Sequence, residues 1–252
     1  MTTSALIFAG GTGSRMNTKT LPKQFLELHG KPIIIHTIEH FEDHPAVSDI
    51  VVVCVDGWLD YCRDLLARFN IKKVSQVVPG GETGQMSIFN GLSVLWEKYK
   101  NDDDYVLIHD GVRPLIDGGI ISKNIEAAKK YGAAITVKPV IETVIQVDEA
   151  DVINQVIERS TCQTAVAPQT FALSKIHSLH LKAQAENQLD GQWMDLAVIT
   201  DLAVADGQHF TLVGLLGGVF RQHDAGSGLA LVVEALDDDA VVQGAQFHSV
   251  NS

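Results

Sequence analysis

Ala9-Gly10-Gly11-Thr12-Gly13-Ser14-Arg15-Met16 is the stretch that decides the fold, and Pro22-Lys23-Gln24 follows it closely. The preceding apolar run, Ala5 to Phe8, predicts a buried first strand. Glycines directly after a strand let backbone N–H groups approach an anion, because no Cβ stands in the way. Arg15 and Lys23 bring two cations to the same region. Backbone amides and paired cations at a strand end suit a nucleoside triphosphate, so the stretch predicts phosphate chemistry.

A tight strand-to-helix turn without any ligand is the alternative for these glycines, and the two cations favour phosphate binding over it. Two other phosphate-binding loops do not fit the spacing. A P-loop requires GxxxxGK[ST], which is absent, and a dinucleotide fingerprint requires a third glycine where Met16 stands.

Composition narrows the classes of function. The chain has 252 residues, 46% of them apolar, and a formal net charge of −12. The length suits one large α/β domain or two small ones, and the acidic balance argues against a nucleic-acid binder. Three cysteines without a CxxC pair indicate inert thiols in a reducing cytosol. No apolar run reaches the roughly 18 residues of a membrane span, so we expect a cytoplasmic protein without membrane contact.

Short apolar runs alternate with helical patterns along most of the chain. The runs lie at 5–8, 50–55, 105–108, 133–137 and 210–213, and the helical patterns at about 32–43, 58–69, 85–99 and 119–131. This alternation predicts an α/β fold with a mostly parallel sheet covered on both faces. Ligands of such sheets bind beyond the carboxyl ends of the strands. The glycine loop and residues 109–114 both follow strands, so we expect them at the same edge.

The region from about 139 to 163 departs from this pattern. Residues 142–147 alternate, a turn signal follows at 148–151, and 152–157 again look extended. We predict a β-hairpin arm with little core of its own. Such an arm usually packs on another surface, and a second subunit is the natural candidate.

Two further segments at the predicted ligand edge each have two interpretations. Asp110 follows an apolar strand, where a carboxylate can hold Mg²⁺ together with phosphate oxygens. It could instead cap the next turn or pair with Arg113. The second segment, residues 79–87, could hold a base or ribose through Gly80, Gly81 and Ser87, or could be a plain loop at a helix N-terminus.

Polar residues outside these loops have ordinary explanations as well. Arg159 and Thr143 lie on the predicted arm, where an exposed arginine is usually solvated, and Thr200 most simply caps a helix. A row of histidines at 36, 40 and 44 shares one helical face, so a metal stripe is conceivable. Glutamates at 39 and 42 favour an ordinary solvated face instead.

Taken together, the motifs resemble the cytidylyltransferases that join CTP to a polyol phosphate, a family that includes the methylerythritol-phosphate and ribitol-5-phosphate enzymes. The match runs from about residue 5 to 213. The matching segments are AGGTGSRM (9–16), LPKQF (21–25), GKPIIIHTIEHF (30–41), GGETGQMSIFNGL (80–92), HDGVRP (109–114), PVIETV (139–144), ERS…APQTF (158–171) and ITD (199–201). The AGG loop, LPKQF and the KPIIIHTIEHF helix are most similar to the ribitol-phosphate branch.

The resemblance implies a Rossmann-like nucleotidyltransferase fold, Mg²⁺ dependence, CTP and a polyol phosphate as substrates, and a homodimer that exchanges β-arms. It also implies roles for individual residues. Arg15 and Lys23 would be catalytic, Asp110 would position Mg²⁺, and Thr143, Arg159 and Thr200 would contact the polyol phosphate. The nucleotide would be held by Ala9, Gly10, Gly11, Gly13, Gly80, Gly81, Ser87 and Asp110.

The chain departs from the family pattern in three places. Gly84 stands where the family usually has arginine, and Ala167 stands where it often has threonine. The late F-N-I-K segment, whose lysine contacts phosphate in the family, is absent, and residues 219–226 stand in its place.

We therefore divide the chain into a cytidylyltransferase domain, 1–213, and a divergent tail, 214–252. A shifted reading frame after about residue 220 would explain the tail. Alternatively, Arg221 or His223 replaces the lysine.

Three functions remain open on this basis. The first is a cytidylyltransferase that makes CDP-ribitol or a close CDP-polyol. The second is the methylerythritol-phosphate enzyme. The third, suggested by Gly84 and the missing lysine, is a catalytically impaired nucleotide-binding homologue.

Overall fold

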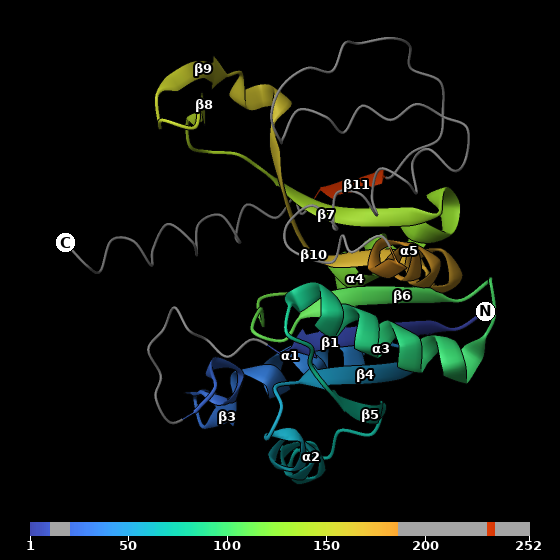
Figure 1. Ribbon diagram of the computed structural model, residues 1–252. Helices are drawn as coiled ribbons and strands as arrows, with labels where there is room; N and C mark the ends of the chain where they lie inside the picture. The colour runs from blue at the N-terminus through green and yellow to red at the C-terminus, as the bar shows by residue number, and fades with distance from the viewer. Residues whose placement is uncertain (11–20, 186–230, 235–252) are drawn as a thin grey trace.

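The structure is a computed structural model that describes residues 1–10, 21–185 and 231–234 (Figure 1). Across these residues a seven-stranded sheet forms the centre, in the order β11-β7-β10-β6-β1-β4-β5. The strands are β1 (Thr3–Ala9), β4 (Asp49–Cys54), β5 (Val74–Pro79), β6 (Tyr105–Asp110), β7 (Ala133–Pro139), β10 (Gln163–Ala172) and β11 (Leu231–Glu234).

The sheet is mostly parallel. Strand β1 pairs in parallel with β4 and β6, β4 with β5, and β7 with β11, whereas β10 is antiparallel to both β6 and β7. Strand β4 is buried along its whole length, as expected for a strand with both faces covered. The predicted α/β class and parallel sheet are confirmed.

Helices cover the two faces of the sheet, and alternate residues of β1 pack on opposite sides. On one face Ile7 joins a core with α1 (Ile33–Glu42), α2 (Leu59–Arg68) and α4 (Gly118–Tyr131). On the other face Leu6 joins a core with α3 (Gly84–Tyr99) and α5 (Leu173–Ala185). Figure 1 shows α3 and α5 on the same side of the strands.

Side-chain caps and glycines set the ends of two of these helices. Thr83 accepts from the amide of Met86 at the start of α3, and Asp117 accepts from the amide of Ile120 at the start of α4. Helix α4 ends at Gly132, which has a φ of 88°, a left-handed conformation that favours glycine. These local signals explain why the predicted helix boundaries agree with the structure to within about two residues.

The predicted β-hairpin arm is present as β8 (Val144–Val147) paired antiparallel with β9 (Ile153–Ile157). It forms a sheet of its own, followed by the short 3₁₀ helix η3 (Arg159–Thr161), and projects beyond the main sheet (Figure 1). Large apolar side chains on and beside the arm are exposed. They are Ile141, Ile145, Val147, Val152, Ile153 and Val156.

Several elements were not predicted from the sequence. They are β5, β10, β11, α5, the 3₁₀ helices η2 (Lys23–Phe25) and η3, and the small hairpin of β2 (Glu27–Leu28) and β3 (Lys31–Pro32). The predicted strand at 210–213 and the proposed domain boundary after 213 lie outside the described residues.

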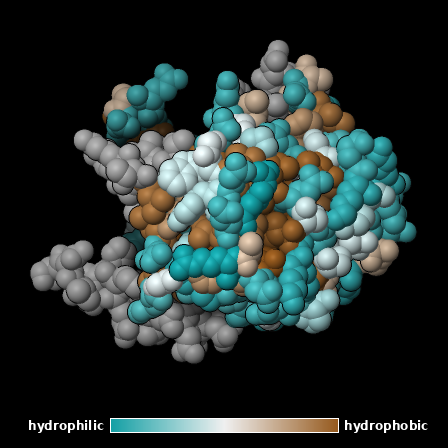
Figure 2. Space-filling model, turned by 90° about the horizontal axis from the view of Figure 1, so that it is seen from below, coloured by the Kyte–Doolittle hydropathy of each residue, from teal (hydrophilic) through white to brown (hydrophobic). Residues whose placement is uncertain are grey.

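The surface seen from below, the side of α2 in Figure 1, carries apolar side chains mixed with hydrophilic ones (Figure 2). No helix in the described parts of the chain is long and apolar enough to cross a membrane.

Gly91 sets how closely α3 packs on the sheet. A Cβ there would overlap the side chain of Leu6 and lie 2.8 Å from Cγ2 of Val53. We expect Gly91→Ala to lower the free energy of unfolding by about 1–3 kcal/mol through overpacking. Urea denaturation measures this change. Gly84→Ala, in open space on the same helix, is the matched control and should leave stability unchanged or slightly raised. Equal stability of the two variants would contradict the prediction.

Candidate active site

Three chain segments meet closely at the carboxyl edge of the sheet. Gly10 follows β1 and Gly80 follows β5, with the amide of Gly80 donating to the carbonyl of Cys54 at 2.7 Å. A Cβ on Gly80 would lie 3.2 Å from Cα of Gly10 and 3.1 Å from Oγ of Ser87, and a Cβ on Gly10 would lie 2.8 Å from that same oxygen. A side chain at either glycine would therefore force a neighbouring group to shift, which explains glycine at both positions.

Ser87 holds the second glycine loop closed. Its buried hydroxyl accepts from the amide of Gly81 at 3.0 Å and donates to the carbonyl of Thr83 at 2.9 Å. Thr83 also caps α3, so the plain-loop features expected at a helix N-terminus are present. In this arrangement Ser87 shapes the loop from inside, and its contact with a nucleotide stays a prediction.

Lys23 is brought to the same edge through its neighbour. The side chain of Gln24, which is fully buried, donates from Nε2 to the carbonyl of Ala9 at 2.7 Å. This bond ties η2 to the end of β1. Lys23 forms no ion pair within the described residues, so its charge is available to an anion there.

Asp110 lies beside the glycine cluster because of strand register. It ends β6 and pairs with Phe8 of β1, two residues before Gly10. Next to it, Gly111 donates to the carbonyl of Phe8 at 2.9 Å, and a Cβ on Gly111 would lie 3.0 Å from Cβ of Ala9. The predicted sharing of one edge by the two segments is confirmed.

The carboxylate of Asp110 has two local partners. Oδ1 accepts from the amide of Val112 at 3.1 Å, and Oδ2 lies 3.3 Å from Nε of Arg113. Both ordinary roles considered from the sequence, a turn cap and an arginine pair, are therefore present. Neither excludes a ligand, since the side chain of Arg113 is more than half exposed and that of Asp110 is partly exposed.

Whether Mg²⁺ fits at Asp110 depends on whether a single protein carboxylate is enough to hold this ion. Within the described residues there is no group of three or more His, Cys, Asp or Glu placed to hold a metal ion. Mg²⁺ commonly takes one or two carboxylates and fills its shell with water and substrate phosphates. The single carboxylate beside a phosphate-binding edge therefore fits a Mg²⁺ that arrives with the nucleotide.

A cavity of about 160 Å³ adjoins Asp110 and Arg113. Its far wall includes Ala167 and Gln169 of β10 and His180 of α5, with Phe8, Ile88, Ile108, Val166, Phe171 and Ile176 among its apolar lining. Ala167, the position at which the family often has threonine, therefore lies at the site. Sequence reasoning did not assign a site role to Arg113, although the HDGVRP motif contains it.

Thr143 and Arg159 lie on the arm, away from the glycine cluster (Figure 1). Arg159 donates from Nη1 to the carbonyl of Ile141 at 2.9 Å, which fixes it at the base of the arm, and both predicted residues are exposed. Four other predicted site residues, Gly11, Gly13, Arg15 and Thr200, lie outside the described residues.

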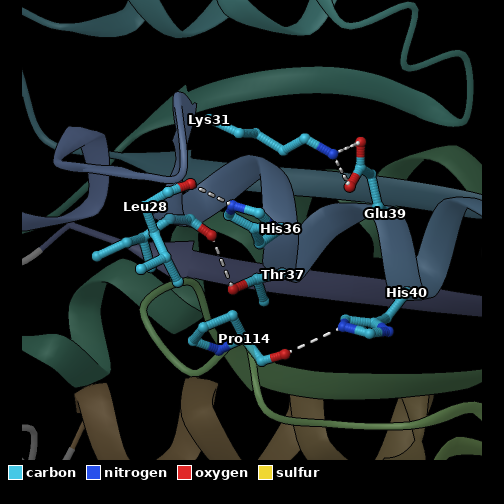
Figure 3. A network of polar contacts seen from close by, with 8 residues as sticks. Leu28, Lys31, His36, Thr37, Glu39, His40 and Pro114 are labelled. Atoms are coloured by element: carbon cyan, nitrogen blue, oxygen red, sulfur yellow. Dashed lines mark hydrogen bonds and ion pairs between the residues drawn. The ribbon is translucent and has the colours of Figure 1, made fainter.

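The histidines of α1 do not form the conceivable metal stripe, and their face is not merely solvated. His36, His40 and His44 each place Nε2 at 2.9–3.2 Å from a backbone carbonyl of a neighbouring loop, and Figure 3 shows the first two. Carbonyl oxygens only accept, so these ring nitrogens are used as donors. The nearby Glu39 binds Lys31 with both carboxylate oxygens 2.7 Å from Nζ.

Bare glycine loops, a free lysine and a carboxylate at the carboxyl edge of a parallel sheet define a nucleotide-binding α/β protein. Residues 3–213 match the family described as IspD: 2-C-methyl-D-erythritol 4-phosphate cytidylyltransferase. The chain therefore belongs to this family of nucleotidyltransferases, which confirms the resemblance seen in the motifs.

Relatives within the family carry two names. A ribitol-5-phosphate cytidylyltransferase of Vibrio parahaemolyticus is 54% identical over 182 residues, 72% of this chain and 76% of that protein. One from Streptococcus agalactiae is 52% identical over 185 residues, 73% of this chain and 77% of that protein. A 2-C-methyl-D-erythritol 4-phosphate cytidylyltransferase of Geotalea uraniireducens is 38% identical over 190 residues, 75% of this chain and 80% of that protein.

Solved structures agree on the fold. The 4-diphosphocytidyl-2C-methyl-D-erythritol synthase of Anaerococcus prevotii superimposes with a TM-score of 0.70 at 21% identity, covering 98% of this chain and 96% of that one. The 2-C-methyl-D-erythritol 4-phosphate cytidylyltransferase of Francisella tularensis gives 0.65 at 25% identity, covering 80% and 87%.

Two buried histidines near the site make stability depend on pH. Burial lowers the pKa of both His109 and His180 to about 4. Below the ordinary pKa of about 6.5 the unfolded chain binds protons that the native rings do not, so the free energy of unfolding falls as pH drops toward 4.

Between pH 7 and pH 5 the free energy of unfolding should fall by about 2 kcal/mol less in His180→Leu than in the unaltered protein. Urea denaturation at the two pH values measures the loss, and the difference between proteins cancels the other titrating groups. An identical pH dependence in both proteins would show that the ring is not held neutral.

Proposed function

We propose that the chain transfers CMP from CTP to a polyol phosphate, with ribitol 5-phosphate as the acceptor, to give CDP-ribitol and pyrophosphate. The observation that carries this proposal is the 54% identity to a ribitol-5-phosphate cytidylyltransferase over 182 residues, 72% of this chain. The second acceptor to consider is 2-C-methyl-D-erythritol 4-phosphate, because the family description and the 38% identical relative name it.

The reaction requires charge stabilisation more than proton transfer. An oxygen of the acceptor phosphate forms a bond to the α-phosphorus of CTP while the bond from that phosphorus to the β-phosphate oxygen breaks. Pyrophosphate carries the bonding electrons away, and negative charge grows on the α-phosphoryl oxygens and the leaving group. Fixed cations placed there accelerate the step.

The residues of this chain have separate tasks in that step. Lys23, held by the bond between Gln24 and Ala9, and Arg15 supply cations to the triphosphate. Backbone groups after Ala9 and around Gly80 and Gly81 receive the nucleotide, with Ser87 shaping the loop. Gly84, where the family usually has arginine, opens onto free space, so the nucleotide receives no cation from that position.

Asp110 would hold Mg²⁺. When bound, this ion offsets charge on the nucleotide phosphates. Asp110 lies in register with the end of β1, which supports a position of its carboxylate beside the phosphates rather than beside the base.

We further propose a homodimer in which the arm of one subunit reaches the site of the other. Support comes from the arm itself, because its apolar side chains are exposed and its strands pack on no core within the described residues. Thr143 and Arg159 lie on this arm and would contact the acceptor phosphate of the partner subunit.

Pyrophosphate release from CTP tests the function directly. We expect release with ribitol 5-phosphate, less or none with 2-C-methyl-D-erythritol 4-phosphate, and dependence on added magnesium. Lys23→Gln should lower kcat/KM roughly 10- to 100-fold, because it removes a charge-assisted contact. Lys31→Gln, which removes a nearby lysine paired with Glu39, is the control and should retain activity. Binding of CTP without release for any acceptor would instead support an impaired homologue.

Exchange of arms between subunits predicts complementation. Lys23→Gln and Arg159→Gln should each be weakly active alone. When they are co-expressed, half of the dimers are mixed, and each mixed dimer has one site with both residues intact. The co-expressed protein should therefore show about a quarter of the wild-type activity. Activity assays on the co-purified protein measure this gain. Activity no higher than the average of the two variants would show that each arm serves its own subunit.

A further inference from the structure

Helix α1 contacts the loop after Asp110 through two side chains, and His44, just beyond the end of α1, contacts the start of α4. Each contact joins residues 74 positions apart in the sequence, so the two segments run side by side. Thr37 Oγ1 lies 3.1 Å from the carbonyl of Gly111 and 3.2 Å from that of Ile33, so the two carbonyls share its one hydrogen. His40 Nε2 lies 3.0 Å from the carbonyl of Pro114. His44 Nε2 lies 3.2 Å from the carbonyl of Gly118 and 3.0 Å from the hydroxyl of Ser122, both in α4. Figure 3 shows Thr37 and His40 on one side of the helix, above Pro114.

His40 and His44 donate a hydrogen bond from Nε2 in these contacts. A carbonyl oxygen only accepts, so Nε2 of His40 and of His44 carries the hydrogen. For His44 the other nitrogen, Nδ1, accepts from the amide of Ala46 at 3.3 Å. That second bond selects the neutral ring with its proton on Nε2.

The loop is also held from the strand side. His109, which is buried, bonds the carbonyl of Arg113 at 3.0 Å and packs its ring 5.2 Å from that of Phe41, a residue of the same helix α1. Residues 111–117 form no helix or strand, yet several of their carbonyls are bonded to side chains instead of facing water. Loops usually have mobile, solvated backbones, so this degree of fixation is specific to the segment that follows Asp110.

We propose that Thr37 and His40 are positioning residues that hold the loop after Asp110 in its reactive geometry, while His44 holds the start of α4 at the far end of that loop. The inference rests on the proposed function, because it takes Asp110 as the residue that would hold Mg²⁺ beside the phosphates in that reaction. Fixing the loop before substrate arrives removes the entropy cost of ordering it during the reaction. A small misplacement of such groups lowers kcat even when nucleotide binding is intact.

Paired variants separate positioning from simple packing. His40→Leu and Thr37→Val remove the donors while keeping the bulk. We expect each to lower kcat roughly tenfold or more, with affinity for CTP, measured without magnesium, changed less than about twofold. His40→Gln and Thr37→Ser retain a donor and should restore most of the rate. Hydrogen exchange at the amide of Val112, which donates to Asp110, should be faster in the first two variants and near normal in the second two.

His36→Leu is the matched control. His36 lies one turn earlier on the same helix and makes the same kind of bond, 2.9 Å to the carbonyl of Leu28, but to the β2–β3 hairpin. It should leave kcat within about twofold and leave exchange at Val112 unchanged.

Unaltered kcat in His40→Leu and Thr37→Val, or no rescue by His40→Gln, would overturn the proposal. So would faster exchange spread over the whole sheet, since that indicates general destabilisation. If the unaltered protein releases no pyrophosphate with any acceptor, the proposed function fails, whereas exchange at Val112 still decides whether α1 holds the loop.

Discussion

The absence of room for a Cβ at the end of β1 is the constraint on which the site depends. Gly10, Gly80 and the hydroxyl of Ser87 approach so closely that a Cβ on Gly10 would lie 2.8 Å from this oxygen, so the hydroxyl or a loop would have to shift. The approach brings the loops after β1 and β5 together at the carboxyl edge of the sheet. We place the proposed nucleotide there, because ligands of parallel sheets bind beyond the carboxyl ends of the strands.

The pairing of the strands then brings Gly80 and Asp110 close to the end of β1. Strand β1 is central, so one neighbour brings the chain to Gly80 by way of β4 and β5, and the other brings Asp110 by way of β6. Residues far apart in the sequence become adjacent because parallel strands end together. The buried Gln24 adds a link that register does not supply, tying the segment that carries Lys23 to Ala9.

Elements with strong periodicity or strong caps were predictable, and those stabilised by tertiary contacts were not. Helices α3 and α4 carry Thr83 and Asp117 as caps, which a sequence displays directly. Strand β5 is an edge strand with polar, exposed Ser75 and Gln76, so it lacks the apolar run of a buried strand. Helix α5 buries His177 and His180, where periodicity analysis expects apolar residues. The glycine loop and Asp110 could be found from motif and spacing, whereas the bonds of Ser87, Gln24 and the α1 histidines depend on which loops the fold brings near them.

The histidines of α1 show why residue type alone does not settle such roles. Three rings on one helical face equally suit a metal, a solvated surface or hydrogen bonding, and the choice depends on what the fold places opposite them. Here each Nε2 faces a backbone carbonyl, which has no hydrogen to offer, so toward that carbonyl the ring nitrogen can only donate. A loop whose carbonyls are bonded in this way cannot rearrange without breaking several bonds at once. The helix next to the sheet therefore determines how rigidly the segment after Asp110 meets its ligand.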